Sequence, residues 1–421
     1  MDSDYIVKRE MYSKIKKHLN KNEITIISGI RQCGKSTVLH KLRTNLIKEG
    51  NKTLFLNFDF DKDKEFLETQ EALVNKLKFE FGNEKGYVFI DEIQRRKNAG
   101  LYLKGIYDLK LPYKFIVSGS GSIELKEKIQ ESLLGRKRIF EMTPVTFTEF
   151  IDYKTDYKYS NRLDKYFEFE KEKTDAFLNE YLNFGGFPRI VTETDSDEKV
   201  KLINEIYNSY IEKDLIKLLN ISNPELFKDI FRMLAFLSGK LLNFTNIAND
   251  TDTSMQTLKK YLYFAEKTFS IKKIRPYFKN TGKEIRKAPM IYFTDIGMMN
   301  YALGKYGNLT NSIDFGFVFQ NFIFNILKEQ VSRNNEIKYW RTTDKAEVDF
   351  VIDKISELIP IEVRYKKMKK ENISRSFRNF INRYNPKDAY IVNLKLNSEI
   401  KINKTTIHFI PYTKLFSLKT L

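Results

Sequence analysis

One stretch constrains this chain more than any other feature: the mostly apolar run Ile24–Ile27 is followed almost at once by Gly29-Ile30-Arg31-Gln32-Cys33-Gly34-Lys35-Ser36. An apolar run that stops at a glycine loop predicts a buried strand, and residues 37–42 behind the loop favour a helix. Gly29 and Gly34 let the backbone wrap closely around a phosphate group, so that successive N–H groups point inward. The start of the helix adds partial positive charge. The sequence therefore predicts a strand–loop–helix unit that binds phosphate.

The residues of this loop have separate expected roles. Lys35 can reach the β- and γ-phosphates of ATP, and the Ser36 hydroxyl can ligate Mg²⁺. Cys33 is needed only for its backbone N–H. The alternative is a chance loop between a strand and a helix. We expect the nucleotide to be bound by Gly29, Ile30, Arg31, Gln32, Cys33, Gly34, Lys35, Ser36 and Thr37.

A second pattern lies at a suitable distance along the chain, where the apolar run Tyr87–Ile90 is followed by Asp91 and Glu92. Four apolar residues predict a strand buried on both faces of a parallel sheet. Ligands of such sheets bind at the carboxyl ends of the strands. We expect Asp91 to hold Mg²⁺ through water and Glu92 to polarise the water that attacks the γ-phosphate. Without the glycine loop, the same residues would read as an ordinary acidic turn.

A third apolar run, Phe115–Val117, ends in Ser118-Gly119-Ser120. Ser120 is placed to sense the γ-phosphate or to orient the attacking water. Simple turn chemistry explains the same residue equally well.

Composition limits the class of protein. The 421 residues predict two to four domains, and 42% hydrophobic with 14% aromatic residues excludes disorder as the main state. One cysteine excludes a disulfide framework, and three scattered histidines argue against a histidine metal site. The start of the chain does not read as a signal peptide, and no run reaches the roughly 18 apolar residues that span a bilayer. We expect a reduced, cytoplasmic protein.

The net charge of +18 is concentrated in two windows. Residues 271–290 carry seven basic residues and one acidic residue, and residues 361–380 carry seven and two. A clustered excess favours a polyanionic partner, DNA in the first place. The lysine-rich usage of an AT-rich genome explains the overall excess but not the clustering.

The patterns along the chain predict an α/β protein with four segments. Residues 1–150 alternate strands and helices, which is typical of a parallel sheet with helices on both faces. Residues 151–225 read as a helical lid, residues 226–305 as a winged helix-turn-helix domain, and residues 306–421 as an α+β domain.

The winged helix prediction has its own candidate contacts. A helix over Ser254–Thr268 would present its polar face outward, and two strands follow, joined by the basic hairpin Lys279–Lys287. Such modules place the second helix in a major groove and the wing on phosphates. The alternative is a winged helix that binds only protein. The residues expected to face outward are Gln256, Lys259, Lys260 and Tyr263.

Acidic residues also alternate on two predicted strands near the C-terminus. Glu347 and Asp349 share one face, and Glu362 and Arg364 share a face of the next strand. Strand-borne acids bind Mg²⁺ in a large class of nucleases, so Asp349 and Glu362 are candidate metal ligands. Arg364 binds phosphate but cannot serve as a tunable proton carrier. Solvated charged residues are the alternative.

Many short motifs occur in a fixed order: Gly-Ile-Arg-Gln-Cys-Gly-Lys-Ser at 29–36, Phe-Ile-Asp-Glu-Ile-Gln at 89–94, Ser-Gly-Ser at 118–120, Leu-Leu-Gly-Arg at 133–136, Gly-Gly-Phe-Pro at 185–188, Ile-Tyr-Phe-Thr-Asp-Ile-Gly at 291–297, Glu-Val-Asp-Phe at 347–350 and Pro-Ile-Glu-Val at 360–363. In this combination the chain resembles a prokaryotic (archaeal and bacterial) AAA+-type P-loop ATPase family with a C-terminal restriction-endonuclease-like domain of formerly unknown function.

The resemblance implies ATP binding and hydrolysis, and it suggests Arg136 as an arginine finger that reaches a neighbouring subunit's nucleotide. A plain basic turn is the alternative for Arg136. Relatives often form rings, which makes a homo-oligomer possible. The chain departs from the family pattern at Gln320, where a carboxylate is usual, and at Arg364, where lysine is usual. These departures predict weak or absent metal-dependent cleavage.

The expected function is therefore an AAA+-type ATPase that couples Mg-ATP hydrolysis to conformational change on DNA or on a DNA-bound partner. Two alternatives remain open at this point. One is an ATP-regulated, metal-dependent nuclease, and the other is a nucleotide-switched scaffold without nucleic acid.

Overall fold

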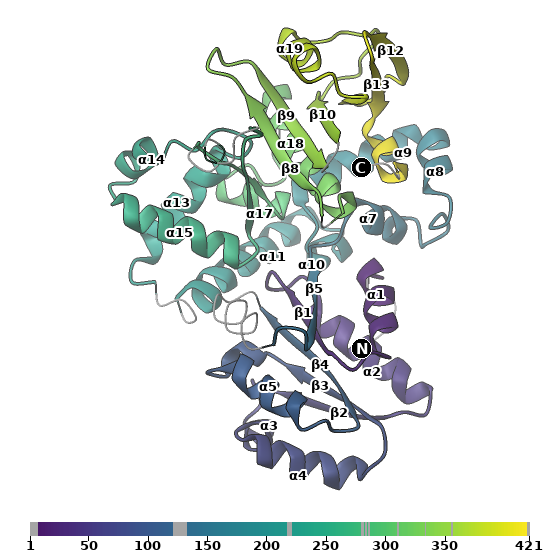
Figure 1. Cartoon of the computed structure of the whole chain (residues 1–421), viewed down its shortest axis with the longest axis vertical. Coiled ribbons are helices and arrows are strands. Elements are labelled where there is room, and N and C mark those ends of the chain that lie inside the picture. Colours follow the sequence, from purple (N-terminus) through teal and green to yellow (C-terminus); the bar gives the residue numbers. More distant parts are fainter. Residues whose placement is uncertain are drawn as a thin grey trace. The chain divides into compact units, whose positions relative to one another are not determined.

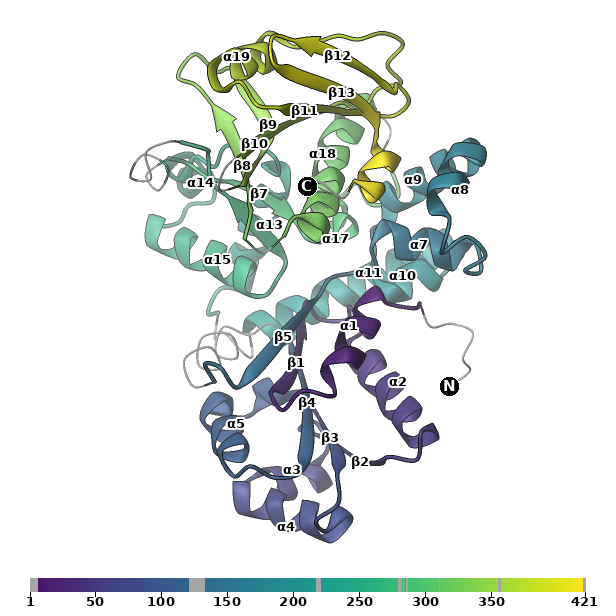
Figure 2. The same ribbon diagram turned by 45° about the vertical axis from the view of Figure 1, so that its right-hand side comes forward.

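The computed structural model describes residues 7–120, 133–216, 221–278, 282, 284, 287–309, 311–332, 334–354 and 357–418. Contacts divide the chain into two compact units, which Figures 1 and 2 show in two orientations. Each unit is discontinuous in sequence. Unit 1 contains Met1–Val145, Phe187–Pro224 and Leu262–Ser270; unit 2 contains Thr146–Gly186, Glu225–Tyr261 and Ile271–Leu421. The expected division into four segments is finer and stays a prediction.

A five-stranded parallel sheet forms the centre of unit 1. Its order is β2-β3-β4-β1-β5, so β4 lies between β1 and β3. Because all the strands run in the same direction, the carboxyl ends of these three strands meet at one edge. This confirms the predicted α/β class with a parallel sheet. The strands are β1 (Ile24–Gly29), β2 (Lys52–Asn57), β3 (Gly86–Asp91), β4 (Tyr113–Ser120) and β5 (Lys137–Met142).

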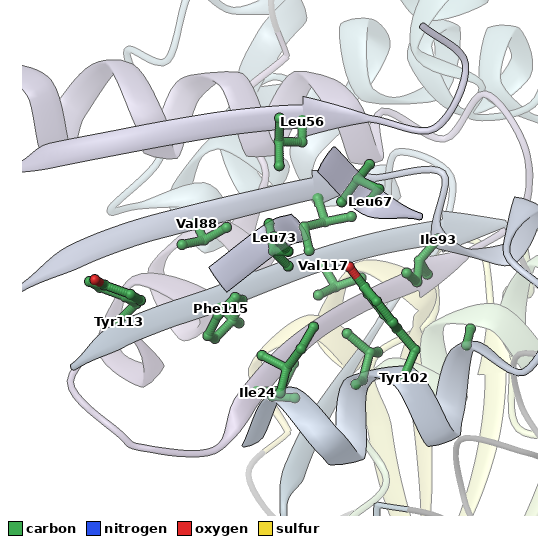
Figure 3. Close-up of a cluster of buried hydrophobic side chains, with 14 of the residues drawn as sticks. Ile24, Leu56, Leu67, Leu73, Val88, Ile93, Tyr102, Tyr113, Phe115 and Val117 are labelled. Carbon is green, nitrogen blue, oxygen red and sulfur yellow. The ribbon is translucent and has the colours of Figure 1, made fainter. Parts of the chain in front are cut away.

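Helices cover this sheet and bury its apolar strands. One face is covered by a cluster to which Leu67, Leu73 and Leu103 contribute from three different helices, as Figure 3 shows for part of the cluster. β1, β3 and β4 are buried along their whole lengths, as their apolar runs predict. The helices of unit 1 are α1 (Glu10–His18), α2 (Lys35–Lys48), α3 (Asp61–Leu67), α4 (Gln70–Phe81), η2 (Ile93–Arg95), α5 (Ala99–Asp108), α10 (Pro188–Thr192), α11 (Ser196–Ser209) and the π-helix η3 (Tyr210–Ile216).

Unit 2 contains a six-stranded mixed sheet in the order β12-β13-β11-β10-β9-β8. Its helix α19 packs on the sheet through Phe377, Phe380 and Ile381, which belong to one buried cluster with Trp340 and Val351. The strands are β8 (Glu336–Arg341), β9 (Glu347–Lys354), β10 (Glu357–Val363), β11 (Asp388–Asn393), β12 (Ser398–Ile402) and β13 (Thr405–Pro411). Apart from the helices between residues 224 and 267, the helices of this unit are α7 (Phe147–Lys154), α8 (Leu163–Phe169), α9 (Lys171–Phe184), α17 (Ile296–Ala302), α18 (Ser312–Gln330), α19 (Arg375–Tyr384) and η4 (Tyr412–Ser417).

Three helices and a two-stranded ribbon occupy the region expected to be a winged helix. They are α13 (Pro224–Phe236), α14 (Phe244–Asp250), α15 (Met255–Lys267), β6 (Ile271–Ile274) and β7 (Met290–Phe293), and the two strands pair antiparallel. Gln256, Lys259, Lys260 and Tyr263 are exposed on α15, as expected. Most of the predicted hairpin Lys279–Lys287 lies outside the described residues.

The chain after β6 is joined to the edge of the mixed sheet. The Tyr277 N–H donates to the Tyr339 carbonyl over 2.6 Å, and the Tyr339 N–H donates to the Arg275 carbonyl over 3.1 Å. The Lys338 ammonium lies 3.1 Å from a Glu284 carboxylate oxygen. This ribbon is therefore anchored to β8 rather than free along its whole length. No helix in the part of the chain that the structure describes is both long and apolar enough to cross a membrane.

Candidate functional site

The phosphate loop lies where β1 passes into α2. Gly29 pairs with Met142 of β5, and a Cβ atom added to Gly29 would lie only 2.2 Å from the Met142 carbonyl oxygen. Glycine is therefore required there for the close approach of the two strands. Gly34 has a φ of +96°, a left-handed conformation that glycine adopts without strain, and α2 begins at the next residue. Local sequence alone explains this turn.

Lys35 is 6% exposed, and its ammonium group donates to the carbonyl oxygens of Gly29 and Ile30 over 3.0 and 2.9 Å. The Lys35 side chain is thus folded back onto the loop that is expected to bind phosphate. Ser36 and Thr37 follow in the first turn of α2, where Ser36 is half-buried and Thr37 is exposed.

Arg9 supports the same loop from a distant position in the sequence. Its guanidinium donates to the Cys33 carbonyl over 2.7 Å and to the Thr143 carbonyl over 2.7 Å. Cys33 itself is fully buried, consistent with a backbone role. No motif in the sequence pointed to Arg9, because its partners lie in two other segments.

The acidic pair lies at the end of β3. Asp91 is 2% exposed, and its Oδ1 accepts from the Ser118 hydroxyl of β4 and from the Glu92 N–H. Glu92 has a positive φ of 57°, and its carboxylate accepts a hydrogen bond from the Gln94 side-chain amide. Burial raises the pKa of Glu92, and Asp91 raises it further, whereas Arg31 and Lys35 oppose this shift. The predicted carboxylates and the loop cations therefore lie within electrostatic reach of one another.

Asp214, on the π-helix η3, completes this cluster. Its carboxylate lies 3.3 Å from Nε of Arg31 in the phosphate loop, and Asp214 is 4% exposed. Burial raises its pKa, while Arg31, then Lys35, then the Ser120 hydroxyl lower it. The Ser120 hydroxyl is itself buried, and among the described residues no hydrogen bond of good geometry reaches it. No local pattern in the sequence marks Asp214, because its partner Arg31 lies 183 residues away.

Arg136 lies far from the phosphate loop of its own chain. The next residue, Lys137, pairs with Ile24 at the start of β1, whereas Gly29 is at the end of that strand. At ~3.3 Å per residue, this separates Arg136 from the loop by roughly 16 Å. Its guanidinium forms an ion pair with Asp108 at 2.9 Å. Arg136 is therefore not placed to act on its own nucleotide.

The second predicted site, in unit 2, brings Gln320, Asp349 and Val363 together. The Gln320 amide donates to Asp349 over 2.9 Å, and the Val363 N–H donates to the other Asp349 oxygen over 2.7 Å. Burial raises the pKa of Asp349 to about 7. Both oxygens of this carboxylate already have partners, and the group holds its charge poorly at neutral pH.

Glu362 is also engaged by its neighbours. One oxygen accepts from Arg364 over 2.7 Å and 2.9 Å, and the other accepts from the Ser374 hydroxyl over 2.8 Å. Among the described residues, no group of three or more acidic, histidine or cysteine side chains is arranged to hold a metal ion. Gln320 and Arg364, the two positions at which the chain departs from the expected family pattern, thus form hydrogen bonds with the two candidate carboxylates.

The motifs Gly-Gly-Phe-Pro at 185–188 and Ile-Tyr-Phe-Thr-Asp-Ile-Gly at 291–297 contact each other. The buried Asp295 of the Thr-Asp-Ile-Gly motif accepts from the Gly186 N–H over 2.8 Å and from the Met298 N–H over 2.7 Å. A Cβ added to Gly297 would lie 2.2 Å from the Phe184 carbonyl oxygen. These motifs therefore join two segments of unit 2.

The residues in unit 1 fit Mg-ATP. Gly34 adopts the left-handed turn that leads into α2, and Lys35 and Arg31 supply positive charge. Within the described residues, Oδ2 of Asp91 accepts no hydrogen bond, so this carboxylate keeps an oxygen for a hydrated cation. Together with the Ser36 hydroxyl, it provides the hard oxygen ligands that Mg²⁺ prefers.

Comparison with known proteins agrees with this assignment at a coarse level. Residues 21–151 match the family model described as an AAA domain, and residues 175–308 and 315–415 match two domains of unknown function, DUF8612 and DUF4143. An uncharacterized protein of Haemophilus influenzae is 27% identical over 358 residues, which cover 82% of each chain. An uncharacterized protein of Methanocaldococcus jannaschii is 26% identical, over 89% of this chain and 81% of that protein. These matches support an AAA+-type ATPase.

Solved structures resemble the chain only distantly. Cdc6p from Pyrobaculum aerophilum matches 73% of this chain and 97% of its own with 13% identity and a TM-score of 0.31. The replication initiator DnaA, bound to AMPPCP and single-stranded DNA, matches 63% of this chain and 92% of its own with 14% identity and a TM-score of 0.29. Likenesses this remote carry no argument about activity.

Proposed function

We propose that this chain hydrolyses Mg-ATP and uses the reaction to change its conformation on DNA or on a DNA-bound partner. One observation carries the proposal: Lys35, the pair Asp91-Glu92 and Ser120 come from three separate segments of the sequence, and these segments follow or end strands β1, β3 and β4 at the carboxyl edge of one parallel sheet. Their mutual effects on the pKa values of Glu92 and Asp214 support a single charged cluster.

The proposed roles follow from the chemistry of each group. The backbone of Gly29–Thr37 and the Lys35 ammonium would bind the phosphates, and Ser36 and Asp91 would hold Mg²⁺, which neutralises phosphate charge when bound. Glu92 would accept a proton from the attacking water, and Gln94 would hold the Glu92 carboxylate in place. Arg136 would serve a neighbouring copy of the chain, which requires a homo-oligomer.

Nucleotide binding is tested with Lys35→Ala. We expect loss of ATP binding, measured by titration with a fluorescent ATP analogue, because no other ammonium group reaches the loop carbonyls in the described structure. Lys41→Ala, an exposed lysine on the same helix, is the matched control and should bind normally. Equal binding by both variants would remove Lys35 from the site.

Hydrolysis is tested with Glu92→Gln. Loss of the general base should slow turnover by about 10²–10⁴-fold while ATP stays bound. Glu68→Gln removes an exposed carboxylate from a neighbouring segment and should turn over ATP at the normal rate. Normal turnover by Glu92→Gln would show that this role is misassigned.

DNA is the proposed partner of the winged helix-like region and the basic C-terminal domain. Gln256, Lys259 and Lys260 are exposed together on α15, which supports a polar contact face. Adding duplex DNA should raise the ATPase rate, and raising the salt concentration should remove the effect, because phosphate contacts weaken steeply with salt. A rate indifferent to DNA at every salt concentration would favour the scaffold alternative.

The nuclease alternative has less support. Asp349 and Glu362 lie in a restriction-endonuclease-like position by family resemblance, but Gln320 and Arg364 occupy both carboxylates. Incubation of plasmid with the protein and Mn²⁺ should leave the plasmid intact. Cleavage that disappears in a variant with Asp349→Ala and Glu362→Ala would instead establish the alternative.

A further inference from the structure

The exposed face of α19 has an unusual chemistry. Phe377, Phe380 and Ile381 point into the core, and the opposite face consists only of arginine and asparagine apart from the helix ends. At 100° per residue, these outward residues fall within an arc of roughly 140° and form one stripe. The stripe, called the α19 stripe below, contains Arg375, Arg378, Asn379, Asn382 and Arg383.

Composition argues against chance for this stripe. The chain contains 18 arginines among its 73 basic residues, so lysine is three times as common as arginine. α19 nevertheless has three arginines, no lysine and no carboxylate in ten residues. An AT-rich genome that favours lysine does not explain this choice. Arginine offers a planar, bidentate set of donors for phosphate oxygens, which lysine does not.

The arginines of the stripe are not neutralised internally. In the part of the chain that the structure describes, none of Arg375, Arg378 and Arg383 forms an ion pair with a carboxylate. The Arg383 guanidinium lies over the ring of Tyr384, 5.6 Å from the ring centroid. By contrast, Arg341 and Arg364 in the same domain pair with Glu347 and Glu362. The stripe therefore keeps its positive charge for a partner.

A groove runs beside the stripe. It has a volume of about 480 Å³ and lies between α19 and the turn Thr342–Ala346 that joins β8 to β9. Arg375 and Arg383 line one side and Lys345 lines the other, and Asp344 is the one acid among the residues that line it. Positive charge on two sides of a groove suits a chain of phosphates better than a single anion.

The α19 stripe starts beside Glu362, one of the two candidate metal ligands of the C-terminal domain. Ser374 is the N-cap of α19, and its hydroxyl donates to Glu362 over 2.8 Å. Arg364 binds Glu362 and also donates to the Asn372 carbonyl over 2.9 Å. A phosphate backbone lying along α19 would therefore pass close to Glu362 and Arg364 at the start of the helix.

We propose that the α19 stripe and the adjoining groove bind the sugar-phosphate backbone of duplex DNA without regard to sequence. This inference rests on the proposed function and gives its DNA partner a second contact surface. Arginine and asparagine side chains donate to phosphate and sugar oxygens, which position a protein without specifying bases. The described residues from 340 to 384 include no large exposed aromatic side chain, so the surface offers no platform on which single-stranded bases stack.

The test is duplex binding across a salt series with the full-length protein. A fluorescein-labelled 24-base-pair duplex would report binding by anisotropy for the wild type and for a variant with Arg375→Ala, Arg378→Ala and Arg383→Ala. We expect at least a tenfold loss of affinity and a fall of about 2 to 3 in the slope of log K against log salt, since each phosphate contact contributes about 0.9. Replacing the three arginines by lysine should keep most of the slope.

A matched control removes the same charge elsewhere. The variant with Lys14→Ala, Lys17→Ala and Lys48→Ala loses three exposed cations from unit 1 and should bind the duplex normally. If both triple variants lost affinity for the duplex equally, the loss would be due to net charge alone, and the proposal would be overturned. Unchanged binding by the arginine variant, or equal, arginine-dependent binding of a single-stranded oligonucleotide, would overturn it as well. Thermal unfolding of each variant checks that the fold is intact.

The outcomes separate this inference from the proposed function. ATP turnover without DNA should be the same in the arginine variant and in the wild type. If the wild type binds duplex through α19 but hydrolyses no ATP, the proposed function fails and the α19 surface stands. If Lys259→Ala with Lys260→Ala abolishes binding while the arginine variant binds normally, the α19 surface fails and the proposed function stands.

Discussion

At the scale of single residues, the nucleotide site balances two cations against three carboxylates. Arg31 and Lys35 act on Glu92 and Asp214, of which Asp214 is buried like Asp91 and Glu92 is half-buried. Arg31 is shared, because it pairs with Asp214 and also lowers the pKa of Glu92. Changing Arg31 should therefore alter the protonation of a residue that it does not touch.

We predict that Arg31→Ala shifts the acidic limb of the pH–rate profile for ATP turnover to higher pH. The pKa of Glu92 is already raised by burial, and loss of Arg31 removes a group that opposes the shift. Glu92 must be ionised to accept a proton, so its activity appears only above its pKa. The measurement is kcat at saturating ATP between pH 5 and 9. An unmoved limb would contradict the role given to Glu92.

A second residue-scale prediction concerns the C-terminal acids. Gln320→Glu together with Arg364→Lys should create a site that binds Mn²⁺, because it adds a carboxylate beside Asp349 and frees Glu362 from its bidentate partner. Calorimetric titration with Mn²⁺ measures binding directly. The wild type should bind weakly or not at all, and the same substitutions with Asp349→Ala should lose the gain. Tight binding by the wild type would refute this account.

The sequence predicted those site residues that directly follow a recognisable strand, and it missed those that reach the site only through the fold. The phosphate loop, Asp91-Glu92 and Ser120 each end a strand that is visible as an apolar run. Asp214 and Arg9 meet the loop only after folding, and their neighbours in sequence carry no pattern that marks them. The catalytic and binding roles of the phosphate loop, Asp91, Glu92 and Ser120 stay predictions, although these residues lie at the same edge of the sheet.

At the scale of elements, a strand was predicted where its sequence is a continuous apolar run, and β5 and β12, which lack such a run, were missed. β1, β3 and β4 are continuous apolar runs because helices cover both faces. β5 has the mixed sequence Lys-Arg-Ile-Phe-Glu-Met at an edge of its sheet, and β12 alternates between exposed and half-buried residues at another edge. These two edge strands carry little apolar surface, so composition alone does not reveal them.

The edge strand β5 nevertheless constrains the phosphate loop, which leads to a prediction for Gly29→Ala. The added Cβ would lie 2.2 Å from the Met142 carbonyl, so β1 and β5 must separate and the loop must move. We expect a loss of about 1–3 kcal/mol in the free energy of unfolding, from overpacking, together with weaker ATP binding. Thermal unfolding and nucleotide titration measure the two effects.

Gly316→Ala is the control for this substitution. Gly316 lies within α18, and an added Cβ would meet nothing within 4 Å. Alanine should therefore stabilise the protein by about 0.5–1 kcal/mol, because glycine loses more freedom in a helix. If both alanine variants had the same stability, close packing against β5 would not explain the glycine.

At the scale of the whole molecule, the two units are interleaved along the chain. Unit 1 needs Phe187–Pro224 and Leu262–Ser270 in addition to its N-terminal sheet. Tyr210 of η3 is 1% exposed, and its hydroxyl lies 2.8 Å from the Thr268 hydroxyl. A continuous N-terminal fragment therefore lacks part of its own core. Sequence patterns suggested consecutive domains because periodicity reports local structure and not which distant segments pack together.

We predict that a fragment of residues 1–224 unfolds at a lower temperature than the same fragment joined through a flexible glycine–serine linker to residues 262–270. The short segment restores the Thr268 contact and covers the side chains of Tyr210 and Phe269, each worth about 1.5–3 kcal/mol when fully buried. Both fragments contain the same part of unit 2, so this difference isolates the added segment. Circular dichroism during heating measures it, and a Thr268→Val version of the joined fragment should lose part of the gain. Equal unfolding temperatures for the fragment with and without residues 262–270 would mean that this segment contributes nothing to the stability of unit 1, and that the ATPase part folds from the N-terminal residues alone.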